Sequence, residues 1–491
     1  METTEANNRI IFGLKVRQRR MELGLSFLEM SEASGLSVSY LNEIEKGKKY
    51  PKPEKIKALA KALKVQANDL TSTELEGNLA PVGDLLRSNF LRELPLEFFG
   101  IELAKVVELI AMAPGQVGAF ISTLVDLSRN YSLREENFYF GALRAYLEMH
   151  HNYFEDLEEA AERFRDTTGP LPAGAGRVAE LLQSLLTERY GYTVDTGVLE
   201  RHPGLHGMRA VFIPGKKKLL LQSGLTNVQR AFQFAKELGF QYMGLTERAQ
   251  TASLLRVHSF EEVLSHFKAS YFAAALLVGR EAFVEELRAW MRQEVWDEDI
   301  VRRWTEKYAA SPETIIQRMS NLLPSEFGLR KLFIWRFVQD PATGGIRLDK
   351  ELNLIRDRLH SRNGIAEHFC RRWPAVGLLK EVNGLHEPVV VAQRAVHHDT
   401  GEVFLCFTVA RPALPVADHK VSIVLGLLLD DELEKTIRFA ADPALENRSV
   451  GHTCERCSMA DCAERAASPV IYQAREKLHQ IRNALEALNA L

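Results

Sequence analysis

The chain has 491 residues, 46% of them hydrophobic and 26% charged, which is the composition of an ordinary globular protein with about three domains. A formal charge of −3 excludes a polycation, and five cysteines are too few for a disulfide scaffold. The longest apolar stretch, Tyr271 to Gly279, is far shorter than the ~20 residues of a spanning helix, and the acidic start METTEANNR is no signal peptide. These features predict a cytoplasmic protein with no membrane partner.

Charge is unevenly distributed along the chain. Residues 9–64 contain 13 Lys and Arg against 6 Glu, so the remainder is clearly acidic. A small basic region on a larger acidic body is typical of a protein with one electrostatic footprint on an anionic partner.

Hydrophobic periodicity and turn signals predict an α+β multidomain protein. We expect helices over 9–64, helical periodicity over 84–165, a break at 167–176, and further helices over 178–188, 225–243, 260–292, 297–309, 312–322 and 470–490. A β-hairpin is expected at 208–222, and strands at 331–338, 388–396, 402–410 and 420–429. The predicted domains are an all-α bundle (9–70), a helical middle (84–325), a strand-rich C-terminal sensor domain (326–469) and a closing helix (470–491).

The most informative segment lies between residues 26 and 53. Ser26 and Glu29 fit a capping box for a helix from Phe27 to Ser34, and Gly35 suits the turn that follows. Ser37 is placed to cap a second helix, in which Val38, Leu41 and Ile44 share one face and are predicted to be buried. The other face and the following turn are predicted to contact DNA, with short polar side chains at base edges and lysines at phosphates; the predicted DNA-binding residues are Ser37, Ser39, Tyr40, Asn42, Glu43, Lys46, Lys48 and Lys49.

This segment resembles the Cro/repressor (Xre) helix-turn-helix family. The resemblance includes the family's Asn-x-Ile-Glu-Lys-Gly run, here Asn42 to Gly47. It implies that the second helix enters the major groove of double-stranded DNA. The chain departs from the family at Phe27, where a glutamine that touches backbone phosphate is common.

Residues 230–240, RAFQFAKELGF, resemble the RRFxxAHELGH helix of the ImmA/IrrE peptidase-like family. In a zinc peptidase of this kind, two histidines one turn apart bind zinc and the glutamate between them is the general base. Here Lys236 and Phe240 replace the histidines, and Glu237 alone cannot hold the ion. We therefore predict a degenerate, non-enzymatic domain with Phe232, Phe234, Ala235 and Leu238 in its core. The alternative is a peptidase-like enzyme with an attached helix-turn-helix.

Three cysteines near the C-terminus, Cys454, Cys457 and Cys462, are spaced C-x2-C-x4-C. Such spacing lets three thiolates converge on one soft metal centre, either zinc or an iron–sulfur cluster. A fourth ligand could come from Cys370, Cys406, His452 or an exchangeable small molecule.

The cysteine motif and the order of the domains resemble the short-chain fatty acid (ScfR-type) regulators. Asp461, Arg465 and Ala466 match that family's C-terminal pattern, and Cys370 to Trp373 echo its C-P-x-W. The resemblance implies Cys370 as the fourth ligand, an acyl-coenzyme A type effector, and an iron–sulfur cluster as cofactor with zinc as the alternative. The chain departs from the pattern at Ala467 and Ser468.

The last helix carries a heptad-like seam of apolar residues: Ile471, Ala474, Leu478, Ile481, Leu485 and Leu488. The seam suits either a coiled coil or packing on the helix's own domain. We expect a homodimer, because paired half-sites raise affinity for DNA. The sequence as a whole predicts a sequence-specific DNA-binding transcription regulator that responds to an acyl-coenzyme A metabolite, to redox state, or to both.

Overall fold

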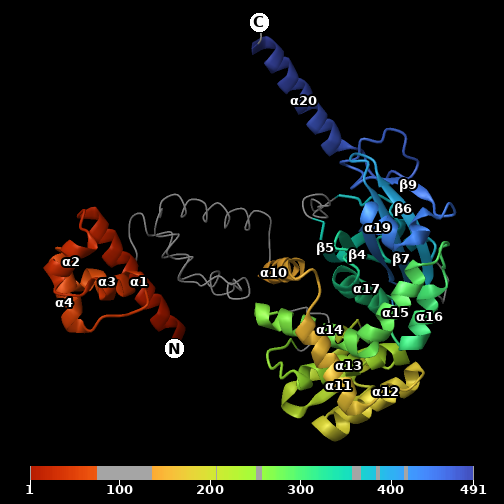
Figure 1. The fold of residues 1–491 in the computed structure, drawn as a ribbon, viewed down its shortest axis with the longest axis horizontal. Helices are drawn as coiled ribbons and strands as arrows, with labels where there is room; N and C mark the ends of the chain where they lie inside the picture. Colours follow the sequence, from red (N-terminus) through yellow and green to blue (C-terminus); the bar gives the residue numbers. More distant parts are fainter. Residues whose placement is uncertain are drawn as a thin grey trace. The chain divides into compact units, whose positions relative to one another are not determined.

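The computed structural model describes residues 2–73, 135–205, 207–249, 257–355, 367–382, 388–413 and 419–489, and the statements below concern these residues. Two compact units share the chain, Met1–Ala142 and Leu143–Leu491, here called the head and the body (Figure 1). The helical periodicity expected between residues 84 and 134 lies outside the described residues. The mixed α+β class is confirmed, with a helical N-terminal region and a C-terminal region that contains a sheet.

The head is a bundle of short helices around one apolar core. Its described helices are α1 (Glu2–Glu22), α2 (Phe27–Ser34), α3 (Val38–Glu45), α4 (Pro53–Ala62) and α5 (Ala67–Thr71). Phe12, Leu41 and Leu59 are almost completely buried in this core. Gly13 lets α1 and α3 cross closely, because a Cβ at this position would collide with the carbonyl oxygen of Ile44.

The N-terminal part of the body is mostly helical. Its described helices are α10 (Glu135–Met149, which crosses the boundary between the units), α11 (Glu155–Thr168), α12 (Ala175–Ser184, continued by a π-helical turn to Arg189), α13 (Asn227–Tyr242), α14 (Phe260–Leu277), α15 (Arg280–Met291), α16 (Ile300–Tyr308) and α17 (Pro312–Glu326). The prediction of one helix over 260–292 is wrong, since Gly279 is extended and separates α14 from α15. The Arg165 guanidinium lies where a Cβ of Gly279 would be, so only glycine fits at this break without a shift.

The hairpin predicted at 208–222 is confirmed as β2 (Ala210–Ile213) and β3 (Lys218–Leu221), which pair antiparallel. A short strand that was not predicted, β1 (Thr193–Asp195), pairs parallel to β3. Three residues are too few to show a period, which explains why the sequence did not reveal it.

The main sheet is built from β4 (Leu332–Gln339), β5 (Ile346–Asn353), β6 (Val389–His397), β7 (Val403–Pro412), β8 (Lys420–Leu428) and β9 (Asn447–Val450). Its described strands run in the order β5-β4-β8-β7-β6-β9. The four predicted strands form the interior of the sheet, and the two missed strands, β5 and β9, form its edges. One face shares an apolar core with the helices, and the other packs on α18 (Pro374–Gly377) and Trp373.

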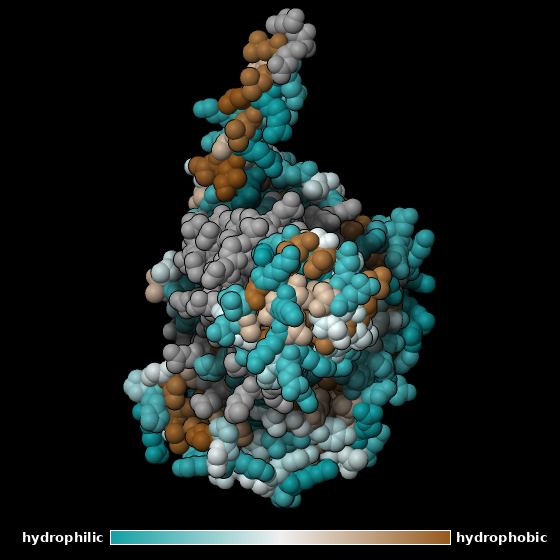
Figure 2. All heavy atoms as spheres, turned by 90° about the vertical axis from the view of Figure 1, so that its left-hand side faces the viewer, coloured by the Kyte–Doolittle hydropathy of each residue, from teal (hydrophilic) through white to brown (hydrophobic). Residues whose placement is uncertain are grey.

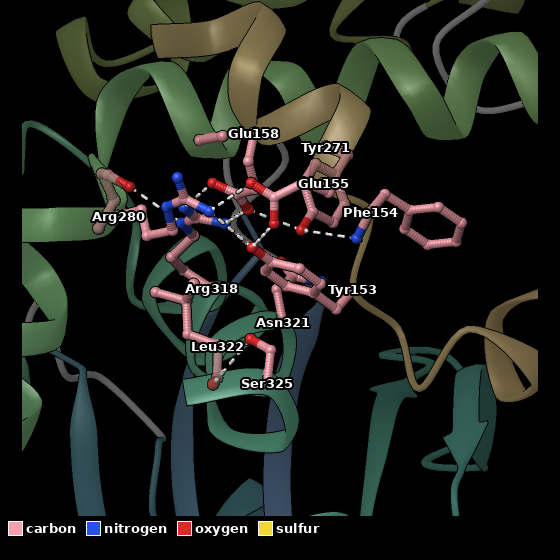
Figure 3. A network of polar contacts seen from close by, with 12 residues as sticks. Tyr153, Phe154, Glu155, Glu158, Tyr271, Arg280, Arg318, Asn321, Leu322 and Ser325 are labelled. Carbon is pink, nitrogen blue, oxygen red and sulfur yellow. Dashed lines mark hydrogen bonds and ion pairs between the residues drawn. The ribbon is translucent and has the colours of Figure 1, made fainter. Parts of the chain in front are cut away.

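A buried ion pair joins three helices of the body (Figure 3). Arg318 of α17 and Glu158 of α11 are bonded through both carboxylate oxygens, and their side chains are 0% and 1% exposed. The Tyr271 hydroxyl of α14 donates to the same carboxylate at 2.7 Å, and Arg318 Nε donates to the Val278 carbonyl at 2.9 Å. Because every polar group of the pair has a partner, the network fixes how these helices pack.

Candidate functional site

The turn between α2 and α3 is built as the sequence predicts. Ser26 Oγ accepts a hydrogen bond from the Glu29 amide at 3.2 Å, and the Glu29 carboxylate accepts one from the Ser26 amide at 2.8 Å. The hydrogen bond from the Ser26 backbone lowers the pKa of Glu29. Gly35 adopts φ of 70°, and Ser31 Oγ donates to the Leu36 carbonyl at 2.5 Å. These contacts fix the angle between the two helices.

One side of α3 is packed and the other is open. Leu41 and Ile44 are fully buried, as predicted. The prediction for Val38 is wrong, because this side chain is 38% exposed. Val38 is the first residue of α3, and side chains on a helix tilt toward its N-terminus, so that of Val38 extends past the core. Ser37 caps the helix by accepting from the Tyr40 amide at 3.3 Å.

All eight predicted DNA-contacting residues belong to α3, its cap or the turn after it. Exposed side chains are those of Ser37, Ser39, Lys46, Lys48 and Lys49, and half-buried ones are those of Tyr40, Asn42 and Glu43. Lys49 Nζ lies 2.8 Å from the Glu43 carboxylate, and the hydrogen bond with Glu43 raises the pKa of Lys49. This pair partly neutralises itself, which leaves the neighbouring Lys46 and Lys48 to supply net positive charge.

A second ion pair, between Arg20 and Glu45, links α3 to α1 and was not predicted from the sequence. Glu45 is buried, and its carboxylate accepts from Arg20 Nε at 2.6 Å and Nη2 at 2.9 Å. The Arg20 guanidinium lies 4.2 Å from the centre of the Phe27 ring. Phe27, the departure from the Xre pattern, thus packs on the side chain that holds α3 in place. The signal available in the sequence was the charged Glu45 directly after the buried Ile44.

The peptidase-like positions on α13 lie in a closed polar cluster, here called the α13 cluster (Tyr192, Lys236, Glu237, Arg248 and His266). Glu237 accepts two hydrogen bonds from Arg248, at 2.7 and 2.8 Å, and one from the Tyr192 hydroxyl at 3.2 Å. Arg248 lies against the rings of Phe212 and Phe240, at 4.0 and 3.8 Å. Arg248 therefore bonds both carboxylate oxygens of Glu237.

Lys236 completes the α13 cluster. It is only 7% exposed, and its Nζ lies 3.1 Å from His266 Nδ1. Burial lowers the pKa of Lys236 to about 7, and burial with the nearby Lys236 charge lowers the pKa of His266 to about 3. His266 Nε2 is 3.0 Å from the Ala249 carbonyl, so a neutral His266 donates there and accepts from Lys236 at Nδ1. Of the predicted core residues, Phe234, Ala235 and Leu238 are buried and Phe232 is half-buried.

The cysteine segment, residues 450–466, lies beside the stretch that carries Cys370. Phe369 and Thr453 form a β-bridge that aligns the two. Cys370, Cys454 and Cys457 are buried and Cys462 is partly exposed. Burial raises the pKa of Cys370, and the nearby charges of Cys454 and Cys457 raise it further. Burial also raises the pKa of Cys457, and the charge of Cys462 raises it further. The structure thus places the stretch that carries Cys370 beside the stretch that carries Cys454 and Cys457.

Two of the four sulfur atoms accept backbone hydrogen bonds, as metal-bound thiolates do. The Gly451 amide donates to Cys370 Sγ at 3.3 Å, and the Ala466 amide donates to Cys454 Sγ at 3.2 Å. A Cβ on Gly451 would lie 2.9 Å from Cys457 Sγ, so only glycine fits there without a shift. These donors suit a soft metal, although within the described ranges no group of three or more His, Cys, Asp or Glu side chains is arranged to hold an ion.

The other two protein candidates for a fourth ligand behave differently. Cys406 on β7 is fully buried, and burial alone raises its pKa, with no influence from the other thiols. His452 contributes its backbone carbonyl, which accepts from the Cys370 amide at 3.2 Å.

A concentration of positive charge lies where the first turn of α17 meets strands β4, β5 and β7 of the main sheet. Atoms of Arg336, Lys350 and Arg411 lie 3.1, 3.5 and 3.5 Å from the Glu313 carboxylate. Burial raises the pKa of Glu313, but these three cations and Arg209 outweigh it and lower that pKa. Positive charge therefore exceeds negative charge around this carboxylate.

Comparison with known proteins agrees with the geometry of the head. Residues 16–70 match the family described as "Helix-turn-helix". The N-terminal unit contains a helix-turn-helix domain. The match includes the capped turn, α3 and all eight predicted DNA-contacting residues.

The chain is also homologous to mycobacterial regulators over most of its length. It is 27% identical over 343 residues to HTH-type transcriptional regulator RamB of Mycobacterium tuberculosis, covering 66% of this chain and 67% of the relative. It is 23% identical over 500 residues to HTH-type transcriptional regulator PrpR of the same species, covering 94% and 92%. A solved structure, "Mycobacterium tuberculosis transcriptional regulator", aligns with a TM-score of 0.47 at 21% identity, covering 66% of this chain and 92% of that one. The domain and this homology support a DNA-binding transcription regulator.

In the part of the chain that the structure describes, no helix is both long and apolar enough to cross a lipid bilayer.

Proposed function

We propose that this protein is a sequence-specific transcription regulator that reads DNA with α3 and changes its DNA affinity in response to signals received by the body. The observation that carries the proposal is the polar, exposed side of α3, held by the Ser37 cap and the Arg20–Glu45 pair within a helix-turn-helix domain. In this proposal Asn42 reads a base edge, and Lys46 and Lys48 bind phosphates. Two copies acting as a homodimer would read paired half-sites.

Selection of binding sites from random DNA, followed by measurement of affinity at several salt concentrations, tests this proposal. Asn42→Ala should cost about 1–3 kcal/mol at the selected site and little on random DNA. Lys48→Ala should weaken both and reduce the salt dependence. Deletion of residues 1–75 with specific binding retained would refute the assignment, and sedimentation of the full chain at micromolar concentration tests the dimer.

The second part of the proposal is a metal centre held by Cys370, Cys454, Cys457 and Cys462. It is supported by the bridge between Phe369 and Thr453, which aligns the two cysteine-bearing stretches, and by the backbone amides that donate to two of the sulfurs. An iron–sulfur cluster would supply a redox-dependent charge at this place, and zinc would supply a structural crosslink. Iron, sulfide and zinc contents after purification under nitrogen and under air distinguish the two.

The third part is an anionic effector of the acyl-coenzyme A type. The excess of positive charge around Glu313 supports a site for its phosphates. Titration with propionyl-coenzyme A should show binding that falls about tenfold or more in Arg411→Gln. Arg302→Gln, which removes an exposed arginine of α16 paired with Asp299, is the matched control. Unchanged binding in Arg411→Gln would move the site elsewhere, and absence of any binding would exclude this effector class.

A further inference from the structure

The last helix, α20 (Val470–Asn489), displays a line of apolar side chains that nothing covers in the described part of the chain. Leu478, Ile481, Leu485 and Leu488 are 64%, 48%, 56% and 63% exposed, and their spacing of three and four residues puts them on one face. Figure 2 shows hydrophobic side chains gathered along this projecting helix. Of the two alternatives left open by the sequence, packing on the helix's own domain is therefore not what the structure displays.

The helix is firmly attached at its start. The amides of Ile471 and Tyr472 donate to the Glu455 carbonyl at 3.0 and 2.9 Å, and the Val470 amide donates to the Ser468 carbonyl at 2.8 Å. A helix of this length with an uncovered apolar seam gains little stability from its backbone alone. Its arrangement is that of a helix that packs against a partner.

Charges beside the seam identify the chemistry of that partner. In the heptad that places Ile471 and Leu478 at a positions, Arg475 and Arg482 occupy e positions and Lys477 a g position. The acidic residues of the helix, Glu476 and Glu486, lie outside these flanks. The border of the seam is therefore positive on both sides.

This pattern disfavours pairing of α20 with a second copy of itself. In a parallel pair, Lys477 of one helix would face Arg482 of the other, and in an antiparallel pair centred on the seam, Arg475 would face Arg482. Both arrangements bring like charges together, which opposes association.

A membrane surface fits less well than a protein helix. Helices that lie in a bilayer interface have a broad apolar face with aromatic anchors, whereas this seam has the narrow width of an a/d stripe. The aromatic residue of the helix, Tyr472, falls outside the seam. We propose that α20 binds an acidic amphipathic helix of a different protein, which covers the Leu and Ile seam and pairs carboxylates with Arg475, Lys477 and Arg482.

Two synthetic peptides of three heptads test this inference on the full-length protein. Both carry Ile at a and Leu at d; one has Glu at every e and g position, and the other has Lys there. Fluorescence anisotropy should show binding of the Glu peptide at least about tenfold tighter than the Lys peptide, because several exposed ion pairs are exchanged for repulsions. Leu478→Asp should abolish binding, and the triple variant R475E/K477E/R482E should reverse the preference.

Gln480→Glu, on the polar side of the helix, is the matched control and should keep the preference. Retained DNA binding by Leu478→Asp would show that the variant is folded, since the substituted side chain is exposed. Equal binding of both peptides, or an unchanged preference in the triple variant, would overturn the inference. Self-association of the parent that Leu478→Asp abolishes, or binding to phosphatidylserine vesicles in place of the Glu peptide, would overturn it in favour of a second copy or a membrane.

Discussion

The α13 cluster and the cysteine segment both stand where the sequence resembles a metal site, and they differ in how their polar atoms are satisfied. In the α13 cluster, each carboxylate oxygen of Glu237 has a protein partner, and Arg248 supplies a positive charge of its own. In the cysteine segment, backbone amides donate to the sulfur atoms of Cys370 and Cys454. The α13 cluster contains its own cation, Arg248, whereas the cysteine segment has sulfur atoms that suit a metal ion from solution.

The difference indicates how a buried carboxylate is accommodated in a core without a metal ion. Because the Arg248 guanidinium pairs with the buried Glu237 carboxylate, the helix that carries it stays stable without an ion. In the cysteine segment, the proposed metal would add its stabilisation only once it is bound. The comparison therefore predicts opposite responses to mutation in the two regions.

The largest effect should be on metal content. Cys457→Ser should lose the metal centre completely, since three thiolates without Cys457 no longer form the ligand set. Metal analysis and visible absorbance of the purified protein measure this. Cys406→Ala is the control, because Cys406 is influenced by burial alone, and it should keep full metal content. A fully loaded Cys457→Ser protein would contradict the site.

In the α13 cluster, the expected effect is on stability. Arg248→Met should cost about 3–5 kcal/mol, because it leaves the buried Glu237 carboxylate unpaired. Adding Glu237→Leu should recover most of this loss in urea unfolding. Arg163→Met removes an arginine from an exposed pair with Glu159 and should cost less than about 1 kcal/mol. Zinc bound at Glu237 in the parent protein would overturn the comparison altogether.

Lys236 should give the α13 cluster a pH dependence. Burial lowers its pKa from 10.5 to about 7, so between these values the folded protein binds fewer protons than the unfolded chain. The free energy of unfolding should therefore rise with pH across this window, by up to about 1.4 kcal/mol per pH unit from this group. Lys236→Met should flatten the rise and the exposed Lys435→Met should not. Equal slopes in both variants would show that Lys236 is charged in the folded state.

The smallest effect should come from Gly451→Ala in the cysteine segment. The added Cβ would lie 2.9 Å from Cys457 Sγ, which must shift and disturb the ligand geometry. Metal affinity should fall about tenfold, as for other changes beside a ligand shell. Gly204→Ala, where a Cβ meets nothing within 4 Å, is the matched control. Competition with a chelator measures both.

Local signals in the sequence predicted local structure well. The capping box at Ser26, the turn at Gly35 and the hairpin around Pro214 depend on neighbours within a few residues, and all are present. The break at Gly279 was missed because the helical pattern continues on both sides of it, and Arg165, which packs against Gly279, lies more than a hundred residues away. Arg248 was missed as the partner of Glu237 for a related reason, since no periodic pattern marks an arginine that folds back on a helix.

The residues of the candidate sites could be chosen from the sequence, but the contacts between them could not. Residue types at fixed spacing identified α3 and the cysteines, since those motifs are themselves local. The edge strands β5 and β9 were not predicted because a polar edge strand lacks a clear alternation of apolar residues. The exposure of Val38 followed from its position at the very start of α3.

The carbonyl of Glu455 lies between Cys454 and Cys457 in sequence and receives the first amides of α20, while the Glu455 carboxylate accepts from the His368 amide at 2.9 Å. The two cysteine-bearing stretches and α20 therefore meet at Glu455. At 1.5 Å per residue, α20 is about 30 Å long. A tilt of about 10° at Glu455 would therefore move the far end of the helix by about 5 Å. A small change in the metal–sulfur bond lengths of the proposed centre would therefore become a larger displacement at the far end of α20, where a partner protein would be bound.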